Sequence, residues 1–239
     1  MYQTMAHLKI FHKIMTELAI FDLDGTLLNT IEDIGRACNY ALKECGYPER
    51  DMREYNMMVG RGIMNLFRKA LPEEYASEEN VARMRDYFVP YYNTHNRDFT
   101  VPYPGIETML AKLSEAGVKL AVASNKYQEG TEMLVKHFFP QFEFVKVLGQ
   151  RDGMPIKPDA AIVWEAMAAV PGISRENVVY CGDSDVDMMT GKNAGVKTIG
   201  VTWGFRTREE LLIHSPAMLA EKASDITDEI LSRSITKER

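Results

Sequence analysis

The chain has 239 residues, of which 46% are hydrophobic and 26% are charged, so it has the composition of a soluble globular protein with one or two domains. The 28 Lys and Arg residues against 34 Asp and Glu residues leave a net charge of −6, which gives no electrostatic reason to bind nucleic acid or an anionic membrane. A small-molecule partner is therefore favoured over these two classes.

The cysteine pattern does not indicate a disulfide framework or a zinc site. Cys38, Cys45 and Cys181 are odd in number and show no close CxxC spacing, so packed thiols are expected. The longest mostly apolar stretch, residues 160–170, is interrupted by Glu165 and is shorter than the roughly 20 residues of a membrane-spanning helix. No membrane segment is expected.

The N-terminal residues carry lysines and histidines among scattered apolar residues, without the unbroken apolar block of a secretory signal. A reducing, cytoplasmic location is therefore expected. Met15 begins a segment that would by itself make a normal start, so residues 1–14 are a candidate for a non-native or misassigned extension. The sequence leaves the oligomeric state open between monomer and homodimer.

A short apolar strand is predicted over residues 17–22. About a hundred residues separate it from the next predicted strand, and the early part of this segment has the pattern of consecutive helices. The first helix is indicated by one apolar stripe with spacings of three, four, four and three residues: Ile31, Ile34, Cys38, Leu42 and Cys45. Thr30 and Asp33 are placed as an N-cap pair at its start. Further helices are expected over residues 51–59, 62–71 and 77–95.

The second half of the chain alternates between strand-like and helix-like segments, which is typical of parallel βαβ units. A helix over residues 105–116 ends at Gly117, and strands are predicted at residues 118–123, 143–147, 177–181 and 196–201. The strands show little alternation, as expected when both faces are covered. We therefore predict an α/β fold: a Rossmann-like parallel sheet core, formed by residues 1–28 and 103–239, with an inserted α-helical cap domain at residues 29–102.

Two carboxylates end the first strand in the segment FDLDGT, residues 21–26. Asp22 and Asp24 lie two residues apart, so in extended backbone both side chains project to the same side. One carboxylate can then attack phosphorus while the other protonates the leaving oxygen, and Gly25 allows a sharp turn immediately afterwards. The alternative is a polar turn with two solvated acids, which is the usual meaning of a bare DxD, whereas DxDGT after an apolar strand is much rarer.

FDLDGT resembles the first signature of the haloacid dehalogenase superfamily, whose phosphatases use the first Asp as nucleophile and the second as acid and base. The resemblance implies these roles for Asp22 and Asp24, and it assigns phosphoryl binding to Thr26. Ser124 and Asn125 close the strand VKLAVA and resemble the second motif, which holds a phosphoryl oxygen. Without the resemblance, this pair is at least as well explained as a helix cap.

Two later motifs complete the resemblance. Lys157 precedes a proline at the expected start of a helix and resembles the third motif, whose ammonium steadies the nucleophile and the phosphoryl charge. GDSDVD, residues 182–187, resembles the acidic fourth motif, which supplies metal ligands. The implied cofactor is Mg²⁺, bound by Asp22, the backbone carbonyl of Asp24 and Asp183, with Asp187 in a supporting position. Because ligands of open α/β sheets bind at the carboxyl ends of the strands, all four motifs are expected to converge there.

Along most of residues 15–205 the sequence is similar to phosphoglycolate phosphatases and their near relatives. The function this implies is Mg²⁺-dependent hydrolysis of a small phosphorylated metabolite through an aspartyl-phosphate intermediate, with phosphoglycolate as first choice. Arg61, between Gly60 and Gly62 in the cap, is the residue expected to bind the carboxylate of phosphoglycolate by paired hydrogen bonds. A solvated Arg61 between two glycines that merely join cap helices is weighed equally.

Other functions stay open at the level of sequence. A phosphomutase of the β-phosphoglucomutase type shares the fold and the nucleophile, although such enzymes usually have Val where this chain has Thr26. A phosphatase for another small metabolite fits the same motifs. A dehalogenase typically lacks the second acid, which is Asp24 here. A non-enzymatic receiver domain carries its phosphorylated Asp on a middle strand, so it is the most distant alternative.

Overall fold

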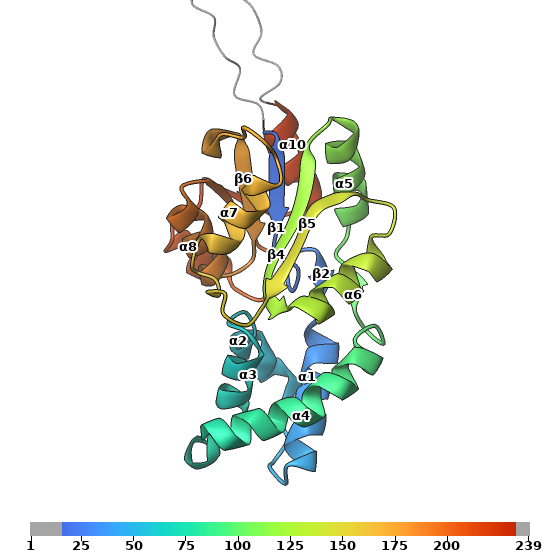
Figure 1. Ribbon diagram of the computed structural model, residues 1–239, viewed down its shortest axis with the longest axis vertical. Helices are drawn as coiled ribbons and strands as arrows, with labels where there is room; N and C mark the ends of the chain where they lie inside the picture. The colour runs from blue at the N-terminus through green and yellow to red at the C-terminus, as the bar shows by residue number, and fades with distance from the viewer. Residues whose placement is uncertain (1–15, 233–239) are drawn as a thin grey trace, which may run out of the picture.

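The computed structural model describes residues 16–232, which form a parallel sheet with helices on both faces and a group of helices at one end (Figure 1). The extension suggested for residues 1–14 lies outside the described residues. Among the helices of residues 16–232, none is both long enough and apolar enough to cross a bilayer.

The main sheet contains strands β1 (Leu18–Phe21), β4 (Lys119–Tyr127), β5 (Phe144–Gln150), β6 (Val178–Gly182), β7 (Lys197–Val201) and β8 (Met218–Ala220). The helices that accompany it are α5 (Ile106–Glu115), α6 (Gln128–Phe138), α7 (Ala161–Ala168), α8 (Asp185–Ala194), α9 (Arg208–Leu212) and α10 (Ala223–Ser232), with a short 3₁₀ turn η3 (Arg175–Asn177). The insertion between β1 and β4 contains α1 (Ile31–Glu44), η1 (Met52–Glu54), α2 (Tyr55–Met58), α3 (Ile63–Ala70), η2 (Glu73–Tyr75) and α4 (Glu78–His95), flanked by β2 (Leu28–Asn29) and β3 (Val101–Pro102).

Strand β1 lies in the middle of the sheet, whose order is β5-β4-β1-β6-β7-β8, and every pairing in it is parallel. Each residue of β1 is paired with β4 on one side and with β6 on the other. The segments that follow these three strands therefore leave the sheet at the same edge, which is the edge that faces the inserted helices in Figure 1.

Successive side chains of a strand point to opposite faces of the sheet, and helices cover both faces. Ala19 and Phe21 pack in one cluster with residues of α5, α6 and α10, whereas Leu18 and Ile20 pack in another with residues of α7 and α8. This double coverage explains why the strands show so little polar alternation. The predicted α/β fold, with a Rossmann-like parallel sheet and an inserted helical cap, is confirmed.

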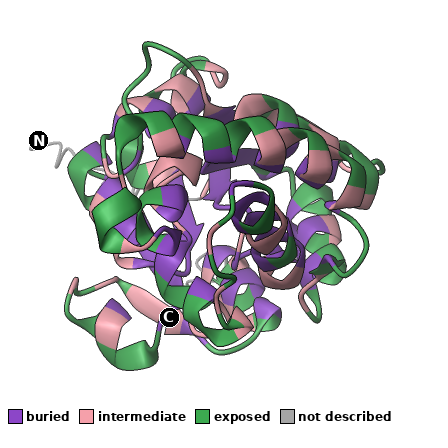
Figure 2. Cartoon of the chain, turned by 90° about the horizontal axis from the view of Figure 1, so that it is seen from below, coloured by how far each residue is buried: buried purple, intermediate pink, exposed green. Residues whose placement is uncertain are grey.

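The inserted helices form a hydrophobic core of their own. Ile34, Cys38 and Leu42 of α1 pack against Phe88 and Tyr92 of α4. Figure 2, seen from the end where these helices lie, shows buried and exposed residues on different sides of the same helices. The predicted apolar stripe of α1 is therefore the face that this helix buries.

The expected packed thiols are confirmed. Cys38 and Cys45 are buried in the core of the inserted helices, and Cys181 is buried in β6. All three are free cysteines, and none of them lines the cavity described below.

Thr30 is the N-cap residue of α1, as predicted, but the predicted capping pair with Asp33 is wrong. The Thr30 side chain makes no capping hydrogen bond, and the Asp33 carboxylate instead accepts hydrogen bonds from the backbone N–H groups of Phe99 and Thr100 and from the Thr100 hydroxyl. The reason is tertiary: β2 pairs antiparallel with β3, which brings the segment that returns from the insertion beside the first turn of α1.

Candidate active site

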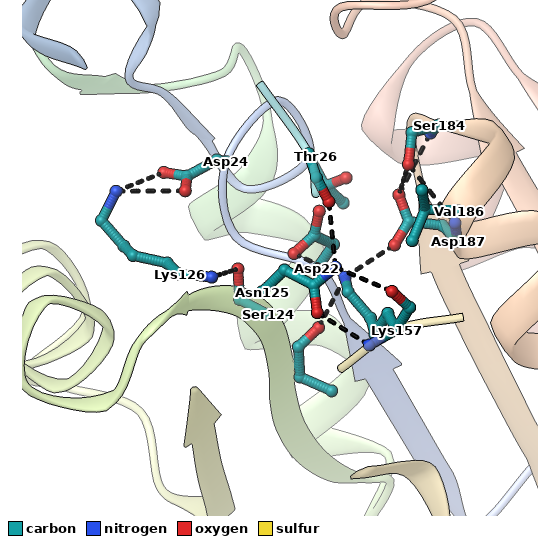
Figure 3. A network of polar contacts seen from close by, with 12 residues as sticks. Asp22, Asp24, Thr26, Ser124, Asn125, Lys126, Lys157, Ser184, Val186 and Asp187 are labelled. Atoms are coloured by element: carbon teal, nitrogen blue, oxygen red, sulfur yellow. Dashed lines mark hydrogen bonds and ion pairs between the residues drawn. The ribbon is translucent and has the colours of Figure 1, made fainter. Parts of the chain in front are cut away.

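Residues that are far apart in the sequence converge at the carboxyl ends of β1, β4 and β6 (Figure 3). They surround a cavity of about 40 Å³. Its polar wall contains Asp22, Asp24, Ser124, Asn125, Lys126, Asp183, Ser184 and Arg206. The inserted helices and the loops between them contribute mainly apolar side chains, namely Ile34, Val59, Ile63, Leu66 and Phe88. The cavity is thus polar on the side of the sheet and apolar on the side of the insertion.

Lys157 is buried, and its ammonium is enclosed by oxygen atoms. Its Nζ forms ion pairs with Asp22 Oδ1 at 3.0 Å and Asp187 Oδ1 at 2.7 Å. It also donates hydrogen bonds to the Ala123 carbonyl at 3.0 Å and the Tyr180 hydroxyl at 2.9 Å. Burial lowers the pKa of Lys157, but the charges of Asp187 and Asp22 outweigh burial and raise it well above its ordinary value. Lys157 therefore presents a permanent positive charge to Asp22.

Asp22 follows the last residue of β1 and is nearly fully buried. Burial raises the pKa of its carboxyl to about 7, the charges of Asp187 and Asp24 add to this effect, and Lys157 opposes it. Although Lys157 lies close enough for an ion pair, Asp22 Oδ1 receives no hydrogen bond from the described residues. A further positive charge beside this oxygen would satisfy it and keep the carboxylate ionised.

Asp183 is held by loops that follow β1 and β7. Its Oδ1 accepts a hydrogen bond from the Thr26 hydroxyl at 3.2 Å, and its Oδ2 accepts one from the Phe205 N–H at 2.7 Å. Gly25, with φ of +85°, and Gly204 pack so closely on Asp183 that a Cβ at either position would overlap its side chain. Both glycines are therefore needed for the close approach of the two loops.

The three buried carboxylates of Asp22, Asp183 and Asp187 fit a divalent cation. Each offers one oxygen, and these oxygens all lie within 4.8 Å of one another. Burial, together with the charges of Asp187 and Asp22, raises the pKa of Asp183 well above its ordinary value, so the single ammonium of Lys157 does not balance the three carboxylates. A set of hard oxygen donors suits Mg²⁺. Asp187 is the least available donor, because Lys157 and Tyr180 occupy its Oδ1 and Ser184 occupies its Oδ2.

Asp24 forms a buried ion pair with a residue that sequence reasoning missed. Lys126 Nζ lies 3.0 Å and 3.1 Å from the two Asp24 carboxylate oxygens, and the two side chains are only 4% and 11% exposed. In Figure 3 the Asp24 carboxylate points toward Lys126 and away from Asp22. Strand β1 ends before Asp22, so the expected projection of both acids to one side does not apply beyond the strand. The position of Lys126 directly after Ser124 and Asn125 was the signal available in the sequence.

Asn125 connects three segments of the chain. Its Nδ2 donates hydrogen bonds to the carbonyls of Gly60 and Lys157, and its Oδ1 accepts one from the Lys157 N–H. The neighbouring Ser124 Oγ accepts a hydrogen bond from the Lys126 N–H. Both residues line the cavity, and the phosphoryl contacts expected of Ser124 and Asn125 stay predictions.

Arg61 lies beside the cavity and is not part of its wall. Its guanidinium pairs with Asp185 at 2.5 Å and its side chain is 41% exposed. The wall contains a different arginine, Arg206, which donates hydrogen bonds from the core to the carbonyls of Asn56 and Val59. Binding of a substrate carboxylate by Arg61 therefore stays a prediction.

Residues 19–201 match the family described as haloacid dehalogenase-like hydrolase. The curated phosphoglycolate phosphatase of Vibrio parahaemolyticus serotype O3:K6 is 29% identical over 221 residues, which cover 89% of this chain and 95% of the relative. The phosphoglycolate phosphatase of Neisseria meningitidis serogroup A is 34% identical over 188 residues, which cover 77% of this chain and 80% of the relative.

A solved structure from Lactobacillus delbrueckii subsp. bulgaricus, provisionally named a phosphoglycolate phosphatase, superposes with a TM-score of 0.83 at 32% identity. The superposition covers 90% of this chain and 98% of that one. The resemblance drawn from the four motifs is thereby confirmed. This chain belongs to the haloacid dehalogenase-like hydrolases, and within them it is a phosphoric monoester hydrolase.

Proposed function

We propose that the enzyme hydrolyses small phosphate monoesters with Mg²⁺, that Asp22 is the nucleophile, and that phosphoglycolate is the leading candidate substrate. One observation carries the proposal: the buried Asp22 carboxylate lies in the cavity wall, with Lys157 on one side and the carboxylate of Asp183 near it. The relatives named above are phosphoglycolate phosphatases, which supports the choice of substrate.

The reaction proceeds in two displacements at phosphorus. In the first, an Asp22 carboxylate oxygen bonds to phosphorus, the bond to the leaving oxygen breaks, and Asp24 gives that oxygen its proton. In the second, Asp24 takes a proton from water, whose oxygen bonds to phosphorus. The bond between phosphorus and Asp22 then breaks, which releases inorganic phosphate and restores the carboxylate.

Charge neutralisation supplies much of the rate enhancement in this kind of reaction. Mg²⁺, when bound by Asp22, Asp183 and the backbone carbonyl of Asp24, supplies positive charge to the nucleophile and the phosphoryl oxygens, with Asp187 in support. Lys157 adds a second positive charge next to Asp22.

The remaining site residues are assigned by position. Ser124 and Asn125 line the cavity and are proposed to hold phosphoryl oxygens. Thr26 is buried, and its hydroxyl donates a hydrogen bond to the Asp183 carboxylate. Its proposed role at the phosphoryl group is therefore to position Asp183.

We further propose that residues 29–102 form the cap domain and that, of the described residues, 16–28 and 103–232 form the catalytic core. The insertion covers the cavity with apolar side chains, which would exclude bulk water from the aspartyl-phosphate.

Replacement of the nucleophile tests the mechanism. Asp22→Asn is expected to abolish turnover of phosphoglycolate, because an amide does not attack phosphorus. Asp24→Asn is expected to bind substrate and to turn over slowly, with a loss of about 10² to 10⁴ in kcat, since it lacks the proton donor. Near-normal phosphate release by Asp22→Asn would remove Asp22 from the mechanism.

Removal of the metal tests the charge argument separately. Phosphate release should stop in a chelator and return with added Mg²⁺, because the clustered carboxylates need a cation to bind an anionic substrate. Full activity in chelator would contradict the role of Mg²⁺. The same assay, repeated with a glucose phosphate, separates hydrolysis from the phosphomutase alternative, which would form an isomerised hexose phosphate instead of inorganic phosphate.

A further inference from the structure

The cavity contains a positive charge that the phosphoryl chemistry does not use. Lys126 lines the cavity, and its ammonium is nearly inaccessible to water. Its hydrogen-bond partners are the two oxygens of Asp24, and its ammonium also lies over the ring of Tyr92, 4.6 Å from the centroid. The partner of Lys126 is thus the residue that must move protons at the leaving oxygen.

The other cations near the cavity are committed to protein groups. Lys157 is surrounded by Asp22, Asp187, Tyr180 and a backbone carbonyl. The buried Arg206 donates to two carbonyls of the insertion, and Arg61 pairs with Asp185 outside the wall. Of the cations considered, Lys126 therefore combines a place in the wall with a partner that has to be released during catalysis.

We propose that Lys126 determines specificity by binding a carboxylate on the leaving group of the substrate. This inference rests on the proposed hydrolysis at Asp22, and it names the substrate class as short phosphate monoesters that carry a carboxylate. In the free enzyme Lys126 pairs with Asp24. In the substrate complex its ammonium pairs with the substrate carboxylate. Asp24, released from the ion pair, takes up a proton from water and turns toward the leaving oxygen, which lies between the phosphoryl group and that carboxylate.

The surroundings of Lys126 favour this exchange. The cavity wall contributed by the insertion is apolar, so an ion pair formed there is weakly screened and is stronger than one at the surface. A leaving group without a charge would leave Asp24 paired with Lys126. Recognition of the carboxylate and release of the proton-transfer residue are therefore coupled through one side chain.

The test compares phosphoglycolate with ethyl phosphate, in which a methyl group replaces the carboxylate. Lys126→Met removes the charge and keeps most of the side-chain volume. It is expected to lower kcat/KM for phosphoglycolate by about 10- to 100-fold more than kcat/KM for ethyl phosphate, as for loss of one charge-assisted hydrogen bond. Lys119→Met is the matched control, because Lys119 lies exposed at the other end of β4, and its substrate ratio should equal that of the wild type.

Equal losses on the two substrates would overturn the proposal, because they would show that Lys126 only holds Asp24. If Lys126→Met does not fold, Lys126→Gln, which can still donate a hydrogen bond to Asp24, is expected to show the same change in ratio. A wild-type enzyme that hydrolyses both esters without preference would contradict the carboxylate class and leave the phosphatase mechanism intact. Activity retained by Asp22→Asn would instead contradict the mechanism itself.

Discussion

Lys157 stabilises the negative charge of Asp22, whereas burial and the charges of Asp187 and Asp24 destabilise that charge. The balance raises its pKa from 3.8 to about 7. In the metal-free protein the folded state therefore binds this proton more tightly than the unfolded state does. The contribution of Asp22 to stability is most favourable below about pH 3.8 and becomes unfavourable as the pH rises toward 7.

This balance predicts that Asp22→Asn is more stable than the wild type in chelator at pH 8, because the amide carries no buried charge. The difference between 3.8 and about 7 corresponds to at most about 4 kcal/mol, or several degrees in Tm. The gain should disappear at pH 4, where the wild-type carboxyl is protonated in the folded state. Thermal melts at the two pH values measure the effect, and equal Tm values at pH 8 would contradict it.

Mg²⁺ provides a second check on the same residue. Saturating Mg²⁺ should raise the Tm of the wild type more than that of Asp22→Asn, since a ligand that binds only the folded state stabilises it in proportion to its affinity. An equal rise in both proteins would show that Asp22 is not a ligand of the ion.

At the scale of single elements, Asp33 joins α1 to the segment that leaves the insertion. Its buried carboxylate accepts hydrogen bonds from Phe99 and Thr100, in a place where water cannot replace it. Asp33→Ala would leave buried donors without an acceptor and is expected to destabilise the protein by about 2–4 kcal/mol. The midpoint of urea unfolding measures the loss.

Glu32 provides the matched control for Asp33. It is the neighbouring acid in the same helix turn, and it pairs with Arg36 in an exposed i, i+4 ion pair. Glu32→Ala should change the free energy of unfolding by no more than about 0.5 kcal/mol. Losses of similar size at the two positions would contradict the anchoring role of Asp33.

The elements that the sequence predicted are those with a long apolar pattern. Strands β1, β4, β5, β6 and β7 lie within a few residues of the predicted ranges. Strands β2, β3 and β8 were missed, since elements of two or three residues are too short to show a period. Strand β4 runs to Tyr127, beyond its predicted end at residue 123. The prediction ended too early because the last residues of the strand are mostly polar and resemble a loop in sequence.

At the scale of the whole molecule, the sequence predicted which end of the sheet carries the site. It did not predict the ion pairs and hydrogen bonds between the side chains of the site. Parallel topology alone brings Asp22, Ser124 and Asp183 to one edge. The pairing of Lys126 with Asp24 depends on the direction of Asp24 after β1 ends and on the irregular register of β4 between Ala123 and Tyr127, about which the sequence pattern carries no information. The same applies to Arg206, whose partners are backbone carbonyls of the insertion.

The contact between the insertion and the core gives the last prediction, which concerns Arg61. Arg61 reaches from the insertion to Asp185 at the start of α8, and its ion pair is partly exposed. Such pairs are worth about 0–1 kcal/mol, so Arg61→Ala is expected to lower kcat/KM less than about fivefold. If Arg61 serves only to hold the insertion on the core, the loss should be the same for phosphoglycolate and ethyl phosphate.

Arg68 is the matched control, because its side chain is also 41% exposed but pairs with Glu78 inside the insertion. Arg68→Ala removes an ion pair of the same kind without touching the core, so its activity on both esters should equal that of the wild type. A loss on phosphoglycolate alone in Arg61→Ala, with Lys126→Met equally impaired on both esters, would assign the substrate carboxylate to Arg61. The two variants measured side by side therefore decide which cation recognises the carboxylate, because each assignment predicts the opposite pattern of ratios.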